Sequence, residues 1–163
     1  MTIIKAQLDL HTVLFNNCID GINEEQAWER ANENVNPIIW MAGHLVGTRM
    51  SMSSFGGFEP DNSFDGFFGH DQKLDTSKTY PSLAAIKEAW NDISEKISKG
   101  IGNMPQEAWA SPSPSKMPIA DDTMAGFMAF LMHHEAYHIG QMGILRKFAG
   151  AKAMSYRQPE AAK

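Results

Sequence analysis

The sequence predicts an all-α fold, a four-helix bundle of the kind in which long connections cross between helices. Four segments repeat apolar residues at every third or fourth position, which is the pattern of a helix that buries one face. No segment alternates apolar and polar residues over the length of a strand. Helices of this kind bury their apolar faces by packing on one another. Residues 1–150 are expected to form this single domain, and residues 151–163 a C-terminal tail.

The first two helices are expected over about residues 4–22 and 37–55. The apolar stripe of the first helix includes His11. Asn36 is a favourable N-cap for the second helix, and Pro37 suits its first turn, where a missing N–H costs nothing. A polar stretch between these two helices is expected to form a connection with a short helical turn.

A long connection is expected over residues 56–79, which are rich in Gly, Asp and Phe and show no sustained period. The third helix is expected to begin near Pro81 and to be stopped by Gly100 and Gly102. It has the most regular apolar stripe of the chain, which consists of Leu83, Ile86, Trp90, Ile93, Ile97 and Ile101.

The fourth helix follows a proline-rich segment that cannot be one continuous helix. Asp121 or Asp122 is expected to supply its N-cap, and the helix is expected to reach about Phe148. Gly140 and Gly143 lower helix propensity, and close packing against another helix or a second subunit would compensate for this cost. A homodimer is therefore compatible with the sequence.

Composition and charge exclude several classes of function. Lys and Arg number 14 against 19 Asp and Glu, and the net charge of −5 gives no general attraction to a nucleic-acid backbone. The single cysteine, Cys18, allows no intramolecular disulfide. No secretion signal and no apolar run long enough to cross a membrane is present. We expect a cytoplasmic protein that acts on a small molecule, not on nucleic acid or a membrane.

Three histidines are expected on the inner faces of two helices. His134 and His138 lie one turn apart on the fourth helix, so their rings can converge on one ion. His44 lies midway along the second helix, also on the inner face. A shared divalent cation would satisfy one nitrogen of each buried ring and keep a coordination position open for water or substrate. The alternative is a set of hydrogen-bonded core histidines.

The remaining histidines and the cysteine are expected to have other roles. His11 could face the same cavity, but a lone inward histidine is more often a core residue satisfied by hydrogen bonds, so we leave it out of the ligand set. His70 and His133 are expected to be solvated. Cys18 is expected to be a small buried hydrophobe and not a nucleophile.

Residues 134–138 match the H-E-x-x-H pattern of zinc metalloproteases, in which the glutamate is the general base. The longer metzincin pattern fails, because Gln141 stands where it has glycine and Ile144 where it has histidine. A di-iron bundle would need a second Glu-x-x-His step. Glu135 is therefore predicted to be a side-facing group, with roles as a base or as a support for a ligand left open.

Two segments resemble signatures of the DinB/YfiT-like superfamily of metal-binding four-helix bundles. They are Asn-Pro-Ile-Ile-Trp-Met-Ala-Gly-His-Leu at residues 36–45 and His-Glu-Ala-Tyr-His-Ile-Gly-Gln at residues 134–141. In that superfamily one histidine of the second helix and two of the fourth form a metal site. The resemblance implies this role for His44, His134 and His138.

The resemblance also implies a reaction class. Relatives of this kind are commonly thiol-dependent transferases or isomerases that use low-molecular-weight thiols. In such a transferase Tyr137, Gln141 or residues 56–79 would orient the electrophile. The alternatives are a metal-dependent hydrolase and a non-catalytic, stress-related binding module. Three imidazoles also accept copper and iron, but we expect zinc or nickel.

Overall fold

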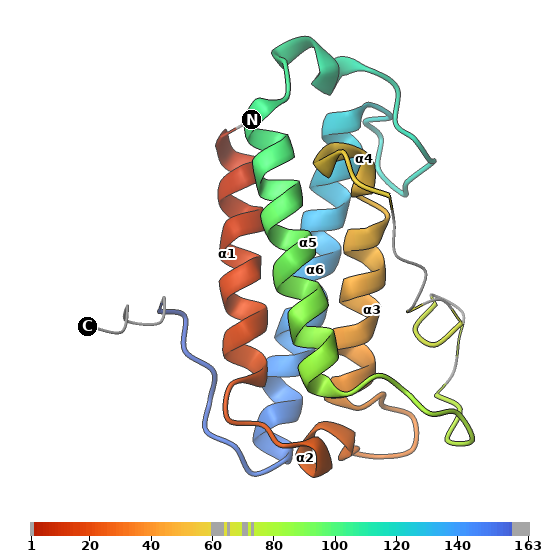
Figure 1. Cartoon of the computed structure of the whole chain (residues 1–163), viewed down its shortest axis with the longest axis vertical. Helices are drawn as coiled ribbons and strands as arrows, with labels where there is room; N and C mark the ends of the chain where they lie inside the picture. The colour runs from red at the N-terminus through yellow and green to blue at the C-terminus, as the bar shows by residue number, and fades with distance from the viewer. Residues whose placement is uncertain (1, 60–63, 65, 70–71, 73, 158–163) are drawn as a thin grey trace.

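The computed structural model describes residues 2–59, 64, 66–69, 72 and 74–157. Four long helices stand side by side in it, and they are α1 (Thr2–Ile19), α3 (Ile38–Met50), α5 (Leu83–Asn103) and α6 (Met124–Phe148) (Figure 1). The shorter helices are α2 (Glu24–Trp28), α4 (Ser53–Gly56) and the 3-10 helix η2 (Gln106–Ala110). Among the described residues there is no strand, only an isolated bridge between Pro112 and Thr123. The predicted all-α class is confirmed.

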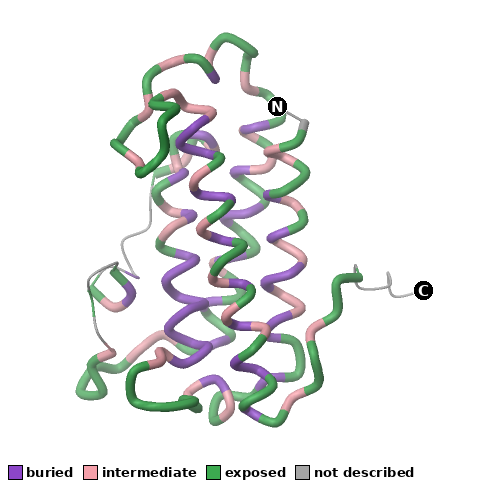
Figure 2. Tube along the Cα trace, turned by 180° about the vertical axis from the view of Figure 1, so that it is seen from behind, coloured by how far each residue is buried: buried purple, intermediate pink, exposed green. Residues whose placement is uncertain are grey.

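The connections set the directions of the helices. In Figure 1, α1 and α6 run one way, and α3 and α5 run the other. Because α3 and α5 are parallel, the connection between them travels the length of the bundle, as the sequence predicts for a long crossover. Figure 2 shows that buried residues face the interior of the bundle and exposed residues face outward.

The core is centred on the apolar stripe of α5. All six residues of the predicted stripe are buried, from Leu83 to Ile101. Trp90 stacks on Phe15 of α1 with ring centroids 4.1 Å apart. The helix begins where Ser82 caps it by accepting a hydrogen bond from the Ala85 amide.

The bounds of α3 differ from the prediction at both ends. Pro37 is the N-cap, because its backbone is extended and its carbonyl already accepts a hydrogen bond from the Met41 amide at 3.1 Å. At the other end the helix stops at Met50. The Ser51 hydroxyl donates to the Thr48 carbonyl and tightens the turn, and α4 follows as a separate helix. The expected single helix over residues 37–55 is therefore two helices.

The expected end of α5 at Gly100 and Gly102 is wrong, because the helix continues to Asn103. Gly100 is the point where α4 crosses α5. A Cβ atom added there would lie 1.7 Å from the carbonyl oxygen of Phe55, whereas one added at Gly102 would meet only the Lys5 side chain at 3.7 Å. Gly100 therefore allows two backbones to approach, and it does not end the helix.

The start of α6 also differs from the prediction. Thr123 is the N-cap and accepts a hydrogen bond from the Gly126 amide. Asp121 acts one step earlier, since its carboxylate accepts hydrogen bonds from the amide and the hydroxyl of Thr123. These bonds lower the pKa of Asp121 below its ordinary value. The helix ends at Phe148, as expected.

The chain turns after α6 at Gly150, which has a φ of +75°, and runs back beside α1. Asn17 donates hydrogen bonds to the carbonyls of Ser155 and Arg157, at 2.7 and 2.9 Å. A Cβ at Gly143 would be in ordinary contact with Met154 at 3.5 Å, so this glycine faces the chain's own C-terminal segment. Within the described ranges, no helix has the length and apolar character needed to span a membrane.

The close approach at Gly100 gives a first prediction. Gly100→Ala should lower the free energy of unfolding by about 1–3 kcal/mol, because the added methyl group overpacks the contact with α4. The matched control is Gly102→Ala in the same helical turn, which should leave that free energy unchanged or raise it by up to about 1 kcal/mol. Urea denaturation followed by circular dichroism measures both, and equal effects would refute this role of Gly100.

Candidate metal centre

His44 is held in place by contacts with Trp40 and Phe68. It is buried on α3, and its ring lies parallel to that of Trp40, with centroids 5.2 Å apart. Its Nδ1 lies 2.7 Å from the carbonyl oxygen of Phe68, which belongs to the long connection after α4. A carbonyl only accepts, so Nδ1 carries the proton and the lone pair is on Nε2, which lies 3.2 Å from Nε2 of His134. The Phe68 ring fills the space over Gly43, where an added Cβ would lie 2.4 Å from it.

The structure brings His44, His134 and His138 together. The two α6 histidines are half-buried and one turn apart, and their ring centroids lie 4.5 Å from each other. The His44 ring lies 5.1 Å from that of His134 and 4.9 Å from that of His138. One nitrogen from each ring can be chosen so that all three lie within 4.8 Å of one another. Three such nitrogens could hold a metal ion.

Gln141 orients His138. Its Oε1 accepts a hydrogen bond from Nδ1 of His138 at 2.7 Å, and its Nε2 donates to the Tyr137 hydroxyl at 3.1 Å. Nδ1 therefore carries the proton, and the lone pair of the His138 ring is on Nε2, the nitrogen opposite Gln141. An imidazole fixed in this way is arranged as metal-bound histidines usually are.

Electrostatics favour the neutral form of His138. Burial lowers the pKa of its imidazole, and the neighbouring His44 lowers it further, while the hydrogen bond to Gln141 opposes these effects in part. The pKa lies below its ordinary value, so the ring is neutral at pH 7. A histidine binds a metal only in this neutral form.

The family follows from a comparison with known proteins. The sequence model of the DinB superfamily matches residues 7–142, most of the chain and all three histidines. The chain belongs to the DinB superfamily. No curated protein matches this DinB protein.

The prediction that Glu135 faces the side of α6 is wrong, because its side chain points into the core. Its side chain is fully buried, and both carboxylate oxygens are engaged, by Arg49 at 2.8 and 2.9 Å and by His11 at 3.1 Å. Burial alone would raise the pKa of Glu135, but the Arg49 charge and these hydrogen bonds hold it below its ordinary value. Glu135 therefore has no free oxygen with which to act as a base toward the histidine cluster.

The other candidates of the sequence lie outside the cluster. His11 is buried and bonded to Glu135, so it is not among the three histidines. His133 is exposed, as predicted, and His70 lies outside the described residues. Cys18 is fully buried, and burial raises the pKa of its thiol to about 12 against an opposing effect of the Arg146 charge. Its predicted role as a buried hydrophobe is confirmed.

A cavity of about 280 Å³ adjoins His44. Its described lining residues are His44, Gly47, Thr48, Phe64, Gly66, Phe68 and Gly69. A larger cavity, of about 520 Å³, lies where α1 and α6 end, and Asn17 and Arg146 line it, but it includes none of the three histidines. The smaller cavity is therefore the one that could admit a substrate to the cluster.

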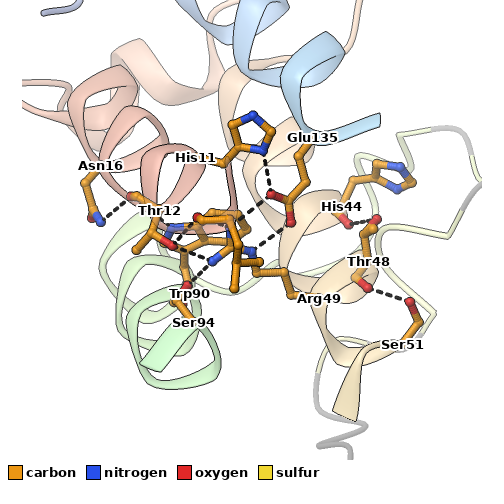
Figure 3. A network of polar contacts seen from close by, with 11 residues as sticks. His11, Thr12, Asn16, His44, Thr48, Arg49, Ser51, Trp90, Ser94 and Glu135 are labelled. Atoms are coloured by element: carbon orange, nitrogen blue, oxygen red, sulfur yellow. Dashed lines mark hydrogen bonds and ion pairs between the residues drawn. The ribbon is translucent and has the colours of Figure 1, made fainter. Parts of the chain in front are cut away.

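Arg49 is a residue of this DinB protein that sequence reasoning missed. It is the only charged residue of α3, and its side chain is fully buried between helices (Figure 3). A lone charge near the end of an otherwise apolar helix reads as a surface residue. One feature of the sequence could have indicated the burial of Arg49. Apolar residues lie around most of α3, so the helix has no polar stripe on which Arg49 could face solvent.

The environment of Cys18 gives a second prediction. At pH 8 the native protein should react with a chromogenic disulfide at least 100-fold more slowly than the same chain in denaturant, because the thiol is buried and un-ionised. Stopped-flow absorbance measures both rates. Comparable rates in the two conditions would restore Cys18 as a candidate nucleophile.

Proposed function

We propose that this DinB protein binds a divalent metal ion, zinc or nickel, through His44, His134 and His138, and that it is a thiol-dependent transferase acting on a small molecule. The observation that carries the metal-binding part is the fixed orientation of two rings. The Phe68 carbonyl and Gln141 accept hydrogen bonds from Nδ1 of His44 and His138, so the lone pair of each ring is on Nε2, and Nε2 of His44 lies 3.2 Å from Nε2 of His134. Neutral imidazoles suit both metals.

Two observations favour a bound thiol as the nucleophile over a group of the chain or a water molecule. Cys18, the single cysteine, is buried in the core and protonated at neutral pH. Glu135, which would activate water in a metalloprotease, has both oxygens occupied. Both observations support a nucleophile that comes from a second substrate, and the hydrolase alternative lacks its motif base.

A divalent ion in the site would lower the pKa of a bound thiol and keep the sulfur as a thiolate at neutral pH. The sulfur would form the new bond to an electrophilic carbon, and the leaving group would depart with the electrons of the broken bond. The chain's own contribution is to hold the His138 imidazole neutral and to shape the cavity beside His44. Tyr137 is exposed and its ring contacts His138, so its hydroxyl could help to orient the electrophile.

The metal content of untagged protein tests the site. The wild type should carry about one zinc or nickel ion per chain by elemental mass spectrometry, and His44→Ala and His138→Ala should each lose it. His133→Ala is the matched control, since it removes an exposed histidine next to His134 and should keep the ion. Equal metal content in all four proteins would refute the site.

Cobalt substitution tests whether a thiol binds to the metal ion. After reconstitution with Co²⁺, addition of a low-molecular-weight thiol should produce a near-ultraviolet absorption band from sulfur bound to cobalt, and His44→Ala should abolish it. A cobalt spectrum that changes with pH but not with thiol would indicate bound water and return support to the hydrolase. A spectrum that responds to neither would favour the binding module.

A further inference from the structure

The fully buried ion pair between Arg49 and Glu135 joins the two helices that carry the histidines. Nε of Arg49 lies 2.8 Å from Oε1 of Glu135, and Nη2 lies 2.9 Å from Oε2, so the contact is bidentate. Arg49 lies five residues after His44 on α3, and Glu135 directly follows His134 on α6. The pair is therefore built from the same two helices as the candidate metal centre, on the side that faces the core.

The guanidinium of Arg49 also binds the other two long helices (Figure 3). Nη1 donates to the hydroxyls of Thr12 on α1 and Ser94 on α5, and Nη2 donates to the Leu8 carbonyl. The guanidinium carbon lies 3.5 Å from the centroid of the Trp90 ring on α5. All five N–H groups are thus used, and every long helix of the bundle meets at this one group.

Such an arrangement constrains position more than it adds stability. A buried ion pair loses so much hydration that apolar residues of similar size often serve a core equally well. A bidentate contact, in contrast, tolerates little movement, whereas one residue of slip along a helix axis is about 1.5 Å. Metal–nitrogen distances tolerate only about 0.2 Å. Apolar packing alone would permit small shifts of α6 against α3 that the histidines could not absorb.

We propose that Arg49 and Glu135 are positioning residues that fix the register of α6 against α3, and thereby the convergence of His44 with His134 and His138. Glu135 stands where the H-E-x-x-H pattern of metalloproteases has a general base, but here it acts through Arg49, within the core. The inference rests on the proposed metal site, and its consequence is that metal affinity depends on two residues that touch no metal.

The test removes both charges together, so that neither is left buried alone. The double variant Arg49→Met/Glu135→Gln keeps an acceptor for His11 and should fold with the helix content of the wild type. Its zinc affinity, measured by competition with a chromogenic chelator, should fall at least tenfold. Its Co²⁺ absorption spectrum should also change in position or intensity. A folded double variant with the affinity and the cobalt spectrum of the wild type would overturn the proposal.

Two further variants separate positioning from stability. Arg146→Met removes a second buried arginine, which lies on α6. Its guanidinium donates to the carbonyls of Cys18 and Asp20, far from the histidine cluster. Arg146→Met should lower the melting temperature and leave the zinc affinity unchanged. A loss of zinc affinity in Arg146→Met would mean that any loss of stability weakens zinc binding, and it would refute a positioning role for Arg49 and Glu135.

If the double variant does not fold, the conservative variant Arg49→Lys tests the positioning role of Arg49 instead. Lysine keeps the charge but loses the two-point contact, so a folded Arg49→Lys protein should still bind zinc more weakly. Wild-type affinity in Arg49→Lys would then overturn the proposal. A wild type that binds no metal is a different result, because it refutes the proposed function itself.

Discussion

The bundle depends on one constraint, which is that a guanidinium placed in the core must have every N–H group bonded. Arg49 meets this requirement with partners from α1, α5 and α6, so the four long helices must be in place together for all of its bonds to form. An unpaired charge in the same place would be strongly destabilising. The polar centre therefore admits one arrangement of the helices, while the apolar residues around it would accept several.

Neighbouring faces of α6 have different roles in the site. His134 and His138 lie beside His44 of α3, while Glu135 points into the core, where it contacts Arg49 of α3 and His11 of α1. The histidines are half-buried and can be reached from outside, whereas the carboxylate is fully enclosed. Reactive groups are thus kept at the edge of the bundle, and the groups that hold them lie within it.

The class of the fold and the meeting of three histidines could be predicted because spacing along a helix determines its faces. The stripe of α5 is regular, and its polar face is clear, so its buried apolar residues were all identified, and only the buried Ser94 was missed. In α6 apolar and small residues lie on every side of the helix, so the pattern could not distinguish a face centred on His134 from one centred on Glu135, 100° away. Arg49 and Glu135 each resemble a surface residue, and only their pairing across the chain makes their burial tolerable. The predicted helix ends were wrong for a local reason. The N-caps Pro37 and Thr123 depend on contacts within one turn of the chain, which the spacing of apolar residues does not reveal.

Gly43 affects the candidate site although it is not itself a candidate ligand. It has no side chain, and this leaves the space in which the Phe68 ring sits and from which the Phe68 carbonyl reaches His44. Any larger residue would force that ring to move, and the acceptor that sets the proton on His44 would move with it. A larger residue at position 43 would therefore change the basicity of the His44 ring without touching that ring, through the Phe68 carbonyl that accepts its Nδ1 proton.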